Sequence, residues 1–152
     1  MSYNLLKGKR GIIFGALNDA SIAWKVAERV VEEGAQIVLT NTAVACRMGT
    51  IDELAKKTSA TIIPADATSV EDLNNLFVKA QEALGGKIDF VLHSCAMSVN
   101  MRKKRTYDDL DYGFLDKTLD ISAISFHKML QVAKKLDALN DEASVLALTY
   151  VA

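Results

Sequence analysis

The amino-acid sequence predicts a doubly wound α/β fold, in which helices cover both faces of one parallel sheet. Short apolar runs rich in β-branched residues recur along the chain, as expected of strands that are buried on both faces. Segments with helical periodicity separate these runs, and such alternation implies a parallel sheet. Because crossovers are right-handed, the expected strand order is 3-2-1-4-5, which is a Rossmann-like topology.

Five segments are expected to form the strands, and they alternate with three helical segments. The strands are residues 11–15, 35–40, 60–66, 87–94 and 143–150, and the only proline, Pro64, is expected to end the third.

Residues that favour helix ends support the helical segments. The first helix follows Ser21, which can cap it, and ends at Gly34. The second covers residues 69–86, with acidic residues in its first turn and two glycines at its end. The third is a long stretch over residues 108–139, with an expected break near Asp120.

The composition is that of one compact domain, residues 1–152. Half of the residues are hydrophobic and the net charge is 18 − 19 = −1, which gives no reason to expect a nucleic-acid partner. Cys46 and Cys95 form no framework of spaced pairs, which suits a reducing compartment. No apolar run approaches the ~18 residues that span a bilayer, and the N-terminus lacks the apolar core of a signal peptide. We therefore expect a cytoplasmic protein with no membrane partner.

This fold also predicts where a ligand binds. Ligands of such sheets lie beyond the carboxyl ends of the strands, where the strand order reverses, here between strands one and four. The segments that meet there begin at Gly15, Asn41, Asp66, Ser94 and Tyr150.

The first strand is followed by a turn that differs from the usual glycine-rich phosphate-binding sequence. Gly15 permits a tight turn, but seven residues, GALNDAS, lead from it to Ser21. Ser21 could donate its hydroxyl to a pyrophosphate while Ile22 offers a backbone N–H at the helix N-terminus. The same residues would equally suit an ordinary capped helix, and the segment by itself does not decide between the two.

The ends of strands two and three hold the next candidates. The acid that normally holds the adenosine ribose is absent after strand two. Thr42 could bond the ribose instead, and Arg47 could meet a 2′-phosphate, although a surface arginine is the preferred interpretation. Asp66 could accept a hydrogen bond from an adenine amino group beside a backbone contact from Ala67, or it could cap the next helix.

The segment after strand four, HSCAMSVN, brings small residues to the expected site. His93 lies in a buried run, so a structural role is preferred to that of a general base. Nothing nearby in the sequence lowers the pKa of Cys95, which is interpreted as a small apolar filler. Neither His93 nor His127 has a second ligand at metal-binding spacing, so no metal is expected. The basic run 102–105 is either a solvated loop or a docking patch for an acidic partner.

Taken together, these segments resemble the NADH-dependent enoyl-acyl-carrier-protein reductases of bacterial type II fatty acid synthesis. These enzymes are divergent short-chain dehydrogenases/reductases, and the sequence of these segments is similar to the form found in Bacteroides-like bacteria. Residues 15–41, 62–69, 87–98, 119–130 and 147–152 carry the resemblance in order and spacing.

The resemblance implies a set of site residues and partners. Cofactor contacts are implied at Gly15, Ser21, Ile22, Thr42, Asp66, Ala67 and Cys95, and acyl-substrate contacts at Ala96, Ser98 and Tyr150. The implied cofactor is NADH rather than NADPH, the implied substrate is an enoyl group on acyl carrier protein, and a homo-oligomer is expected. Where the family usually has Ile-Gly, this chain has Cys95 and Ala96, and the Ala96 methyl would crowd the passing cofactor.

The catalytic tyrosine and lysine of the family follow the pattern Y-x6-K on the helix after strand five, beyond Ala152. Phe114 stands seven residues after Tyr107, and Leu119 seven after Tyr112, so neither tyrosine replaces that pair. The expectation is a cofactor-binding half, truncated after strand five, with no catalytic residue of its own and little activity alone. The alternative is a non-catalytic Rossmann-type binding or oligomerisation module.

Overall fold

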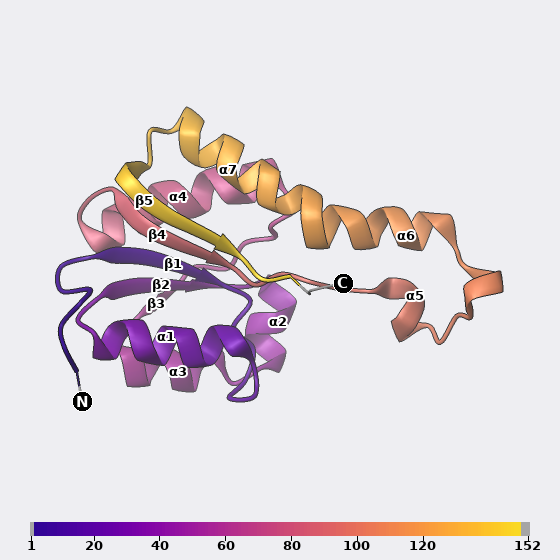
Figure 1. Cartoon of the computed structure of the whole chain (residues 1–152), viewed down its shortest axis with the longest axis horizontal. Coiled ribbons are helices and arrows are strands. Elements are labelled where there is room, and N and C mark those ends of the chain that lie inside the picture. The colour runs from indigo at the N-terminus through magenta and orange to yellow at the C-terminus, as the bar shows by residue number, and fades with distance from the viewer. Residues whose placement is uncertain (1, 150–152) are drawn as a thin grey trace.

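A computed structural model, which describes residues 2–149, has the predicted parallel sheet with strand order β3-β2-β1-β4-β5 (Figure 1). The strands are β1 (Arg10–Phe14), β2 (Gln36–Thr40), β3 (Thr61–Ile62), β4 (Ile88–His93) and β5 (Leu139–Ala147). The central strand, β1, pairs with β2 on one side and β4 on the other, so that Ile12 lies between Val38 and Val91. This position explains why β1 is apolar throughout its buried part.

Helices cover both faces of the sheet, as the doubly wound fold requires (Figure 1). They are α1 (Ile22–Glu32), α2 (Ala43–Met48), α3 (Ile51–Thr58), α4 (Val70–Leu84), α5 (Val99–Arg102), α6 (Tyr112–Leu119) and α7 (Ser125–Lys135), with a 3₁₀ turn, η1 (Tyr107–Asp109), and a π-helical segment, η2 (Asp120–Ile124). Trp24 and Leu54 bring α1 and α3 into the core on one face. Phe77 and Met129 bring α4 and α7 into the core on the other. No helix within residues 2–149 is long and apolar enough to cross a bilayer.

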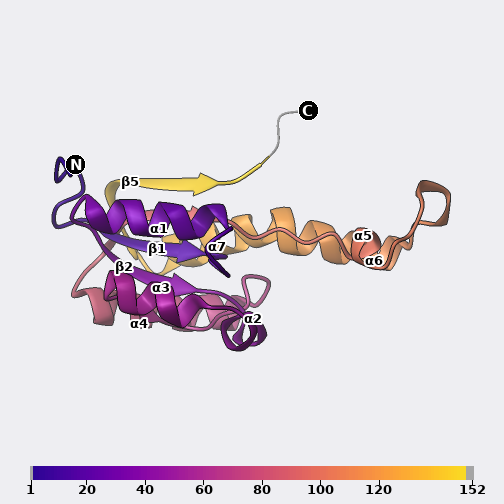
Figure 2. The same cartoon turned by 90° about the horizontal axis from the view of Figure 1, so that it is seen from below.

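One part of the chain extends well beyond the sheet. The segment containing α5 leads outward from β4, and the rod formed by α6, η2 and α7 returns alongside it to the sheet (Figures 1 and 2). The predicted break near Asp120 is therefore real, but it widens the helix into a π turn and does not end it. The predicted helix over residues 108–139 is too long at both ends, because Asp111 caps α6 and the chain enters β5 at Leu139.

The predicted helix ends are confirmed for α4 and only in part for α1. Ser69 accepts a hydrogen bond from the Asp72 N–H (3.2 Å), and Gly85 ends α4 in the left-handed conformation. Ser21 occupies the N-cap position of α1, but its side chain caps no helical N–H. Its hydroxyl instead donates to the carbonyl of Asn18 (2.7 Å), because the long preceding turn folds back on itself.

Two predicted strands are wrong in extent. The ladder of β3 covers Thr61–Ile62 instead of residues 60–66, since β3 is the edge strand and Pro64 has no N–H to contribute. β5 begins four residues earlier than predicted, with an irregular register opposite Ile88–Phe90. The helices α2 and α3, between β2 and β3, were not predicted individually. Tyr150 lies outside the described residues.

Two glycines make close contacts between β1 and the chain of β4 and its following residue. A Cβ atom on Gly11 would overlap the ring of Phe90, and one on Gly15 would overlap the carbonyl oxygen of Ser94. Gly15 also has a φ of +88°, which L-residues rarely adopt. The turn out of β1 therefore requires glycine for both its space and its backbone conformation.

We expect Gly15→Ala to lower the free energy of unfolding by about 3 kcal/mol, since it combines a left-handed backbone with a backbone clash. Gly85→Ala is the matched control, because Gly85 has a φ of +71° and no atom within 4 Å of the added Cβ. That control is expected to cost about 1–2 kcal/mol. Urea denaturation of both variants measures the difference, and equal losses would show that the contact with Ser94 is unimportant.

Candidate functional site

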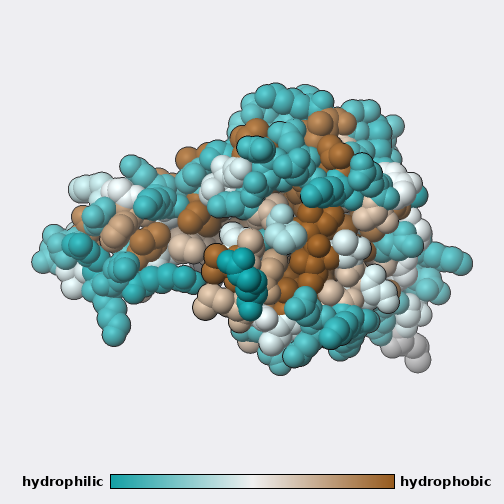
Figure 3. Space-filling view, turned by 180° about the vertical axis from the view of Figure 1, so that it is seen from behind, coloured by the Kyte–Doolittle hydropathy of each residue, from teal (hydrophilic) through white to brown (hydrophobic). Residues whose placement is uncertain are grey.

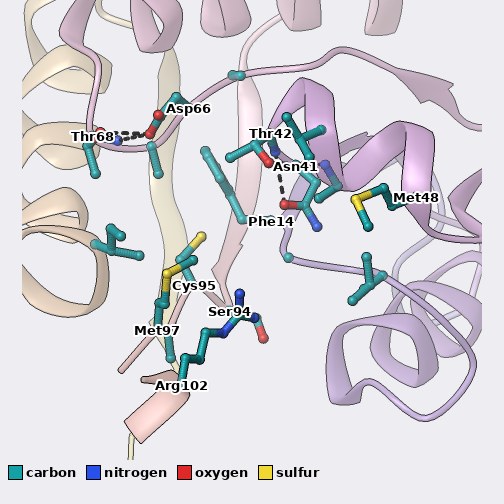
Figure 4. Close-up of a pocket in the computed structure, with 18 residues that line it drawn as sticks. Phe14, Asn41, Thr42, Met48, Asp66, Thr68, Ser94, Cys95, Met97 and Arg102 are labelled. Atoms are coloured by element: carbon teal, nitrogen blue, oxygen red, sulfur yellow. Dashed lines mark hydrogen bonds between the residues drawn. The ribbon is translucent and has the colours of Figure 1, made fainter. Parts of the chain in front are cut away.

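A pocket of about 570 Å³ lies at the carboxyl ends of β1, β2 and β4, where the strand order reverses. Its lining residues are Phe14, Gly15, Leu17, Asn41, Thr42, Val44, Ala45, Met48, Ala65, Asp66, Ala67, Thr68, Ser94, Cys95, Ala96, Met97, Arg102 and Ile121. Asp66 and Thr68 lie on one side of Phe14, and Thr42 and Met48 on the other (Figure 4). In the view from behind, apolar residues gather in the middle of the molecule between the two helical layers (Figure 3).

The turn after β1 forms part of the pocket, but its distal end does not line it. Gly15 donates its N–H to Thr40 (3.0 Å), which keeps the start of the turn beside β2. Ser21 accepts a hydrogen bond from the Leu17 N–H (3.3 Å), so its hydroxyl organises the turn. Gly15 is a lining residue, whereas Ser21 and Ile22 lie outside the lining. Their predicted contact with a pyrophosphate stays a prediction.

Asn41 stands after β2, where many dinucleotide-binding domains have an acid, and it has a structural role. Its amide donates to the carbonyl of Ala16 (3.2 Å) and accepts from the N–H of Thr42 (2.9 Å), which ties the end of β2 to the turn after β1. Thr42 in turn caps α2 by accepting from the Ala45 N–H (3.2 Å). Arg47 is exposed and outside the lining, in agreement with its interpretation as a surface arginine.

Asp66 stands at the mouth of the pocket after β3. Its Oδ1 accepts hydrogen bonds from the Thr68 N–H (2.8 Å) and the Thr68 hydroxyl (2.7 Å). The alternative interpretation of Asp66 as a helix cap is wrong, because Ser69 caps α4. No group within residues 2–149 donates a hydrogen bond to Oδ2, which is therefore able to accept one from a ligand. Ala67, the next residue, lines the same wall.

The segment after β4 forms the opposite wall. Burial raises the pKa of the Cys95 thiol to about 12, and the nearby negative charge of Asp66 acts in the same direction. The thiol therefore stays protonated at neutral pH, as its interpretation as an apolar filler requires. Ala96 lines the pocket, and Met97 donates its N–H to the hydroxyl of Ser122 in η2 (3.1 Å). Ser98 lies outside the lining and caps α5.

His93 has a structural role, as predicted. It is 2% exposed, and its ring packs between Phe14 and Phe126 with centroid distances of 5.9 and 5.4 Å. Nε2 lies 2.9 Å from the Ser125 hydroxyl, whose own proton goes to the carbonyl of Ile121 (2.7 Å). The Ser125 oxygen thus accepts from Nε2–H of a neutral ring. Burial lowers the pKa of His93, which favours the same neutral form.

Arg102 is a charged pocket residue that the sequence does not single out from its basic run. Residues 102–105 are all exposed, but only Arg102 among them lines the pocket. Arg105 pairs with Asp109 (2.9 Å). The run is therefore divided between the pocket, the solvent and an ion pair.

The lining as a whole is suited to binding a ligand more than to catalysing a reaction. It is largely apolar with a few directed polar groups, which is the usual character of a cofactor pocket. Among residues 2–149, no cluster of His, Cys, Asp and Glu could hold a metal ion.

Comparisons with known proteins agree with this geometry. A family model described as enoyl-(acyl carrier protein) reductase matches residues 15–152. The chain is 36% identical over 147 residues to enoyl-acyl-carrier-protein reductase (NADH) 1 of Rhizobium meliloti, covering 96% of this chain and 53% of that protein. It is 33% identical to the FabI enzyme of Rickettsia bellii, covering 99% and 56%.

Solved structures show the same relationship. FabI from Alistipes finegoldii is 70% identical with a TM-score of 0.95, over 98% of this chain and 57% of that one. The FabI–NADH complex from the same organism has a TM-score of 0.96 and 70% identity, over 97% and 52%. The chain thus spans about half the length of the relatives that it matches. Since the family model covers most of its residues, the chain belongs to the enoyl-acyl-carrier-protein reductase family.

Proposed function

We propose that residues 1–152 form a single dinucleotide-binding domain that supplies the NADH site of an enoyl-acyl-carrier-protein reductase. The observation that carries this proposal is the pocket at the switch point, which joins the β1 turn, the β2 and β3 ends and the segment after β4. The similarity to a FabI–NADH complex supports it. The use of cysteine and the family support a cytoplasmic location.

The described residues fit a dinucleotide. Oδ2 of Asp66 is the proposed acceptor for an adenine amino group, and Thr42, which lines the pocket after β2, is the proposed partner of the ribose. The N-terminus of α1, with Ser21 and Ile22, suits the pyrophosphate. Cys95 and Ala96 line the wall proposed to face the nicotinamide end, where the Ala96 methyl narrows the passage. Because Arg47 lies outside the pocket lining, no cation at the end of β2 favours a 2′-phosphate, and NADH is the preferred cofactor.

The proposed reaction is reduction of a trans-2-enoyl thioester carried by acyl carrier protein. NADH supplies the hydride when it is bound. The residues of this chain hold and orient the dinucleotide, and the apolar wall excludes water. Ala96, Ser98 and Tyr150 are the proposed neighbours of the acyl group. The family uses a Tyr to stabilise the enolate and a Lys to hold the ribose, in the pattern Y-x6-K. The two tyrosines within residues 107–119 do not form such a pair.

We expect the chain to bind NADH and Asp66→Asn to weaken that binding about tenfold, because an amide NH2, which cannot accept a hydrogen bond, replaces the carboxylate oxygen proposed to accept from the adenine amino group. Asn can still accept the two hydrogen bonds from Thr68, so the turn should persist. Asp52→Asn, an exposed change on α3, is the control. Fluorescence titration measures the dissociation constants. No binding by the unchanged chain at millimolar NADH would contradict the proposal and favour a non-catalytic module.

The 152-residue polypeptide is expected to oxidise NADH with a crotonyl thioester no faster than the protein-free mixture. Oxyanion stabilisation is usually a large part of catalysis, and residues 1–152 hold no Tyr–Lys pair in the family's pattern. NADH absorbance with and without the thioester measures the rate. Turnover at an ordinary enzymatic rate would show that another group of this chain replaces the pair.

Self-association is a second element of the proposal. Tyr112, Leu119 and Ile124 are 75%, 48% and 49% exposed on the projecting rod. Leu146 is 59% exposed on β5, an edge strand with unpaired backbone groups. We expect light scattering to give a mass above that of one chain, and Leu119→Lys to reduce it. A monomer at high concentration would contradict this expectation.

A further inference from the structure

The side chain of Lys128 joins three parts of the molecule beside the pocket. Its ammonium donates to the carbonyl oxygen of Thr68 (2.9 Å), in the loop after β3, and to Oδ1 of Asp120 (2.8 Å), the first residue of η2. We propose that Lys128 is a positioning residue for the adenosine end of NADH, acting through Thr68 and Asp66. The inference rests on the proposed function.

The π-helical segment is what lets Lys128 and Asp120 meet. In an ordinary α-helix, each residue turns by ~100°, so residues eight apart point ~80° away from each other. A π turn inserts about one extra residue, which leaves the two side chains only ~20° apart on one face. The insertion at η2 thus places the Asp120 carboxylate on the side of the rod where Lys128 extends toward α4.

Thr68 passes the position of Lys128 on to Asp66. The carbonyl of Thr68 is held by the ammonium, while its N–H and hydroxyl both donate to Oδ1 of Asp66 (2.8 and 2.7 Å). The backbone N–H of Asp66 donates to Oδ2 of Asp72 in α4 (2.9 Å). The Asp66 backbone N–H and its Oδ1 are therefore both held, which limits the positions that Oδ2 can take at the pocket wall.

The positive charge of Lys128 also suits its surroundings. Its ammonium bonds the Asp120 carboxylate directly, and the carboxylates of Asp66 and Asp72 are linked to it only through Thr68 and the backbone. The Lys128 side chain is 26% exposed and that of Asp120 is 38% exposed, so the pair is partly shielded from water. Ile121, the residue after Asp120, lines the pocket itself. The Lys128 ammonium thus links the loop after β3, which holds Asp66 and Thr68, to the π turn η2 beside the proposed cofactor site.

The test compares Lys128→Met, Lys128→Arg and Lys135→Met. Lys135 is exposed in the last turn of the same helix, so its replacement removes the same charge away from the pocket. We expect Lys128→Met to raise the dissociation constants of NADH and ADP-ribose about tenfold, the loss of roughly one charge-assisted hydrogen bond. Lys128→Arg should restore binding to within about twofold, since a guanidinium can donate to both partners, and Lys135→Met should bind as the unchanged chain.

Hydrogen exchange separates positioning from general destabilisation. In Lys128→Met, amide exchange should rise in residues 65–69 and remain unchanged in residues 93–98. Normal affinity of Lys128→Met, no rescue by Lys128→Arg, or an equal rise of exchange in both segments would overturn the inference while leaving NADH binding intact. If the unchanged chain binds neither ligand, the proposed function itself fails. Should Lys128→Met not fold, Asp120→Asn decides, with unchanged affinity counting against the inference.

Discussion

The contact between Gly15, after β1, and Ser94, after β4, is the constraint on which the site depends. Gly15 and the Ser94 carbonyl meet where no side chain could fit, and both residues line the pocket. That leaves the space above the switch point open, and the walls come from the segments that follow β2, β3 and β4. A parallel sheet brings all of these segments to one edge. The pocket is thus a consequence of strand order together with a glycine at the end of β1.

The rod of α6, η2 and α7 holds the wall after β4 in place. The Ser122 hydroxyl accepts from the Met97 N–H and donates to its carbonyl (3.1 and 3.3 Å). One turn later, Ser125 bonds the buried His93 at the end of β4. The rod largely projects from the sheet, and these contacts attach it to both ends of one pocket wall. Ser122 lies within the π turn η2 and Ser125 directly follows it, and such turns often accompany functional sites.

Much of this arrangement could be predicted from the sequence, because buried parallel strands and capped helices leave strong local patterns. The strand order, the ends of α4 and the structural role of His93 follow from apolar runs, a serine followed by acids, and a histidine within a buried run. The extent of β5 could not be predicted, since Asn140, Asp141 and Glu142 are polar and lie in the register irregularity between the paired residues Leu139 and Ser144, where the Asn140 side chain donates to Asp89. Nor could the place of Arg102 in the pocket lining, which depends on the short helix α5.

The absent acid after β2 has a structural explanation. Asn41 uses its amide as both donor and acceptor to close the gap between β2 and the long turn after β1, a task that an ionised carboxylate, with no proton to donate, could not perform toward the Ala16 carbonyl. The negative charge at this edge of the sheet stands one strand further out, on Asp66, where the Thr68 N–H and hydroxyl hold it. The turn after β1 and the end of β2 are therefore coupled through Asn41, while the acid after β3 leaves one carboxylate oxygen at the pocket wall. The chain thus forms a pocket at the switch point without the usual glycine-rich sequence.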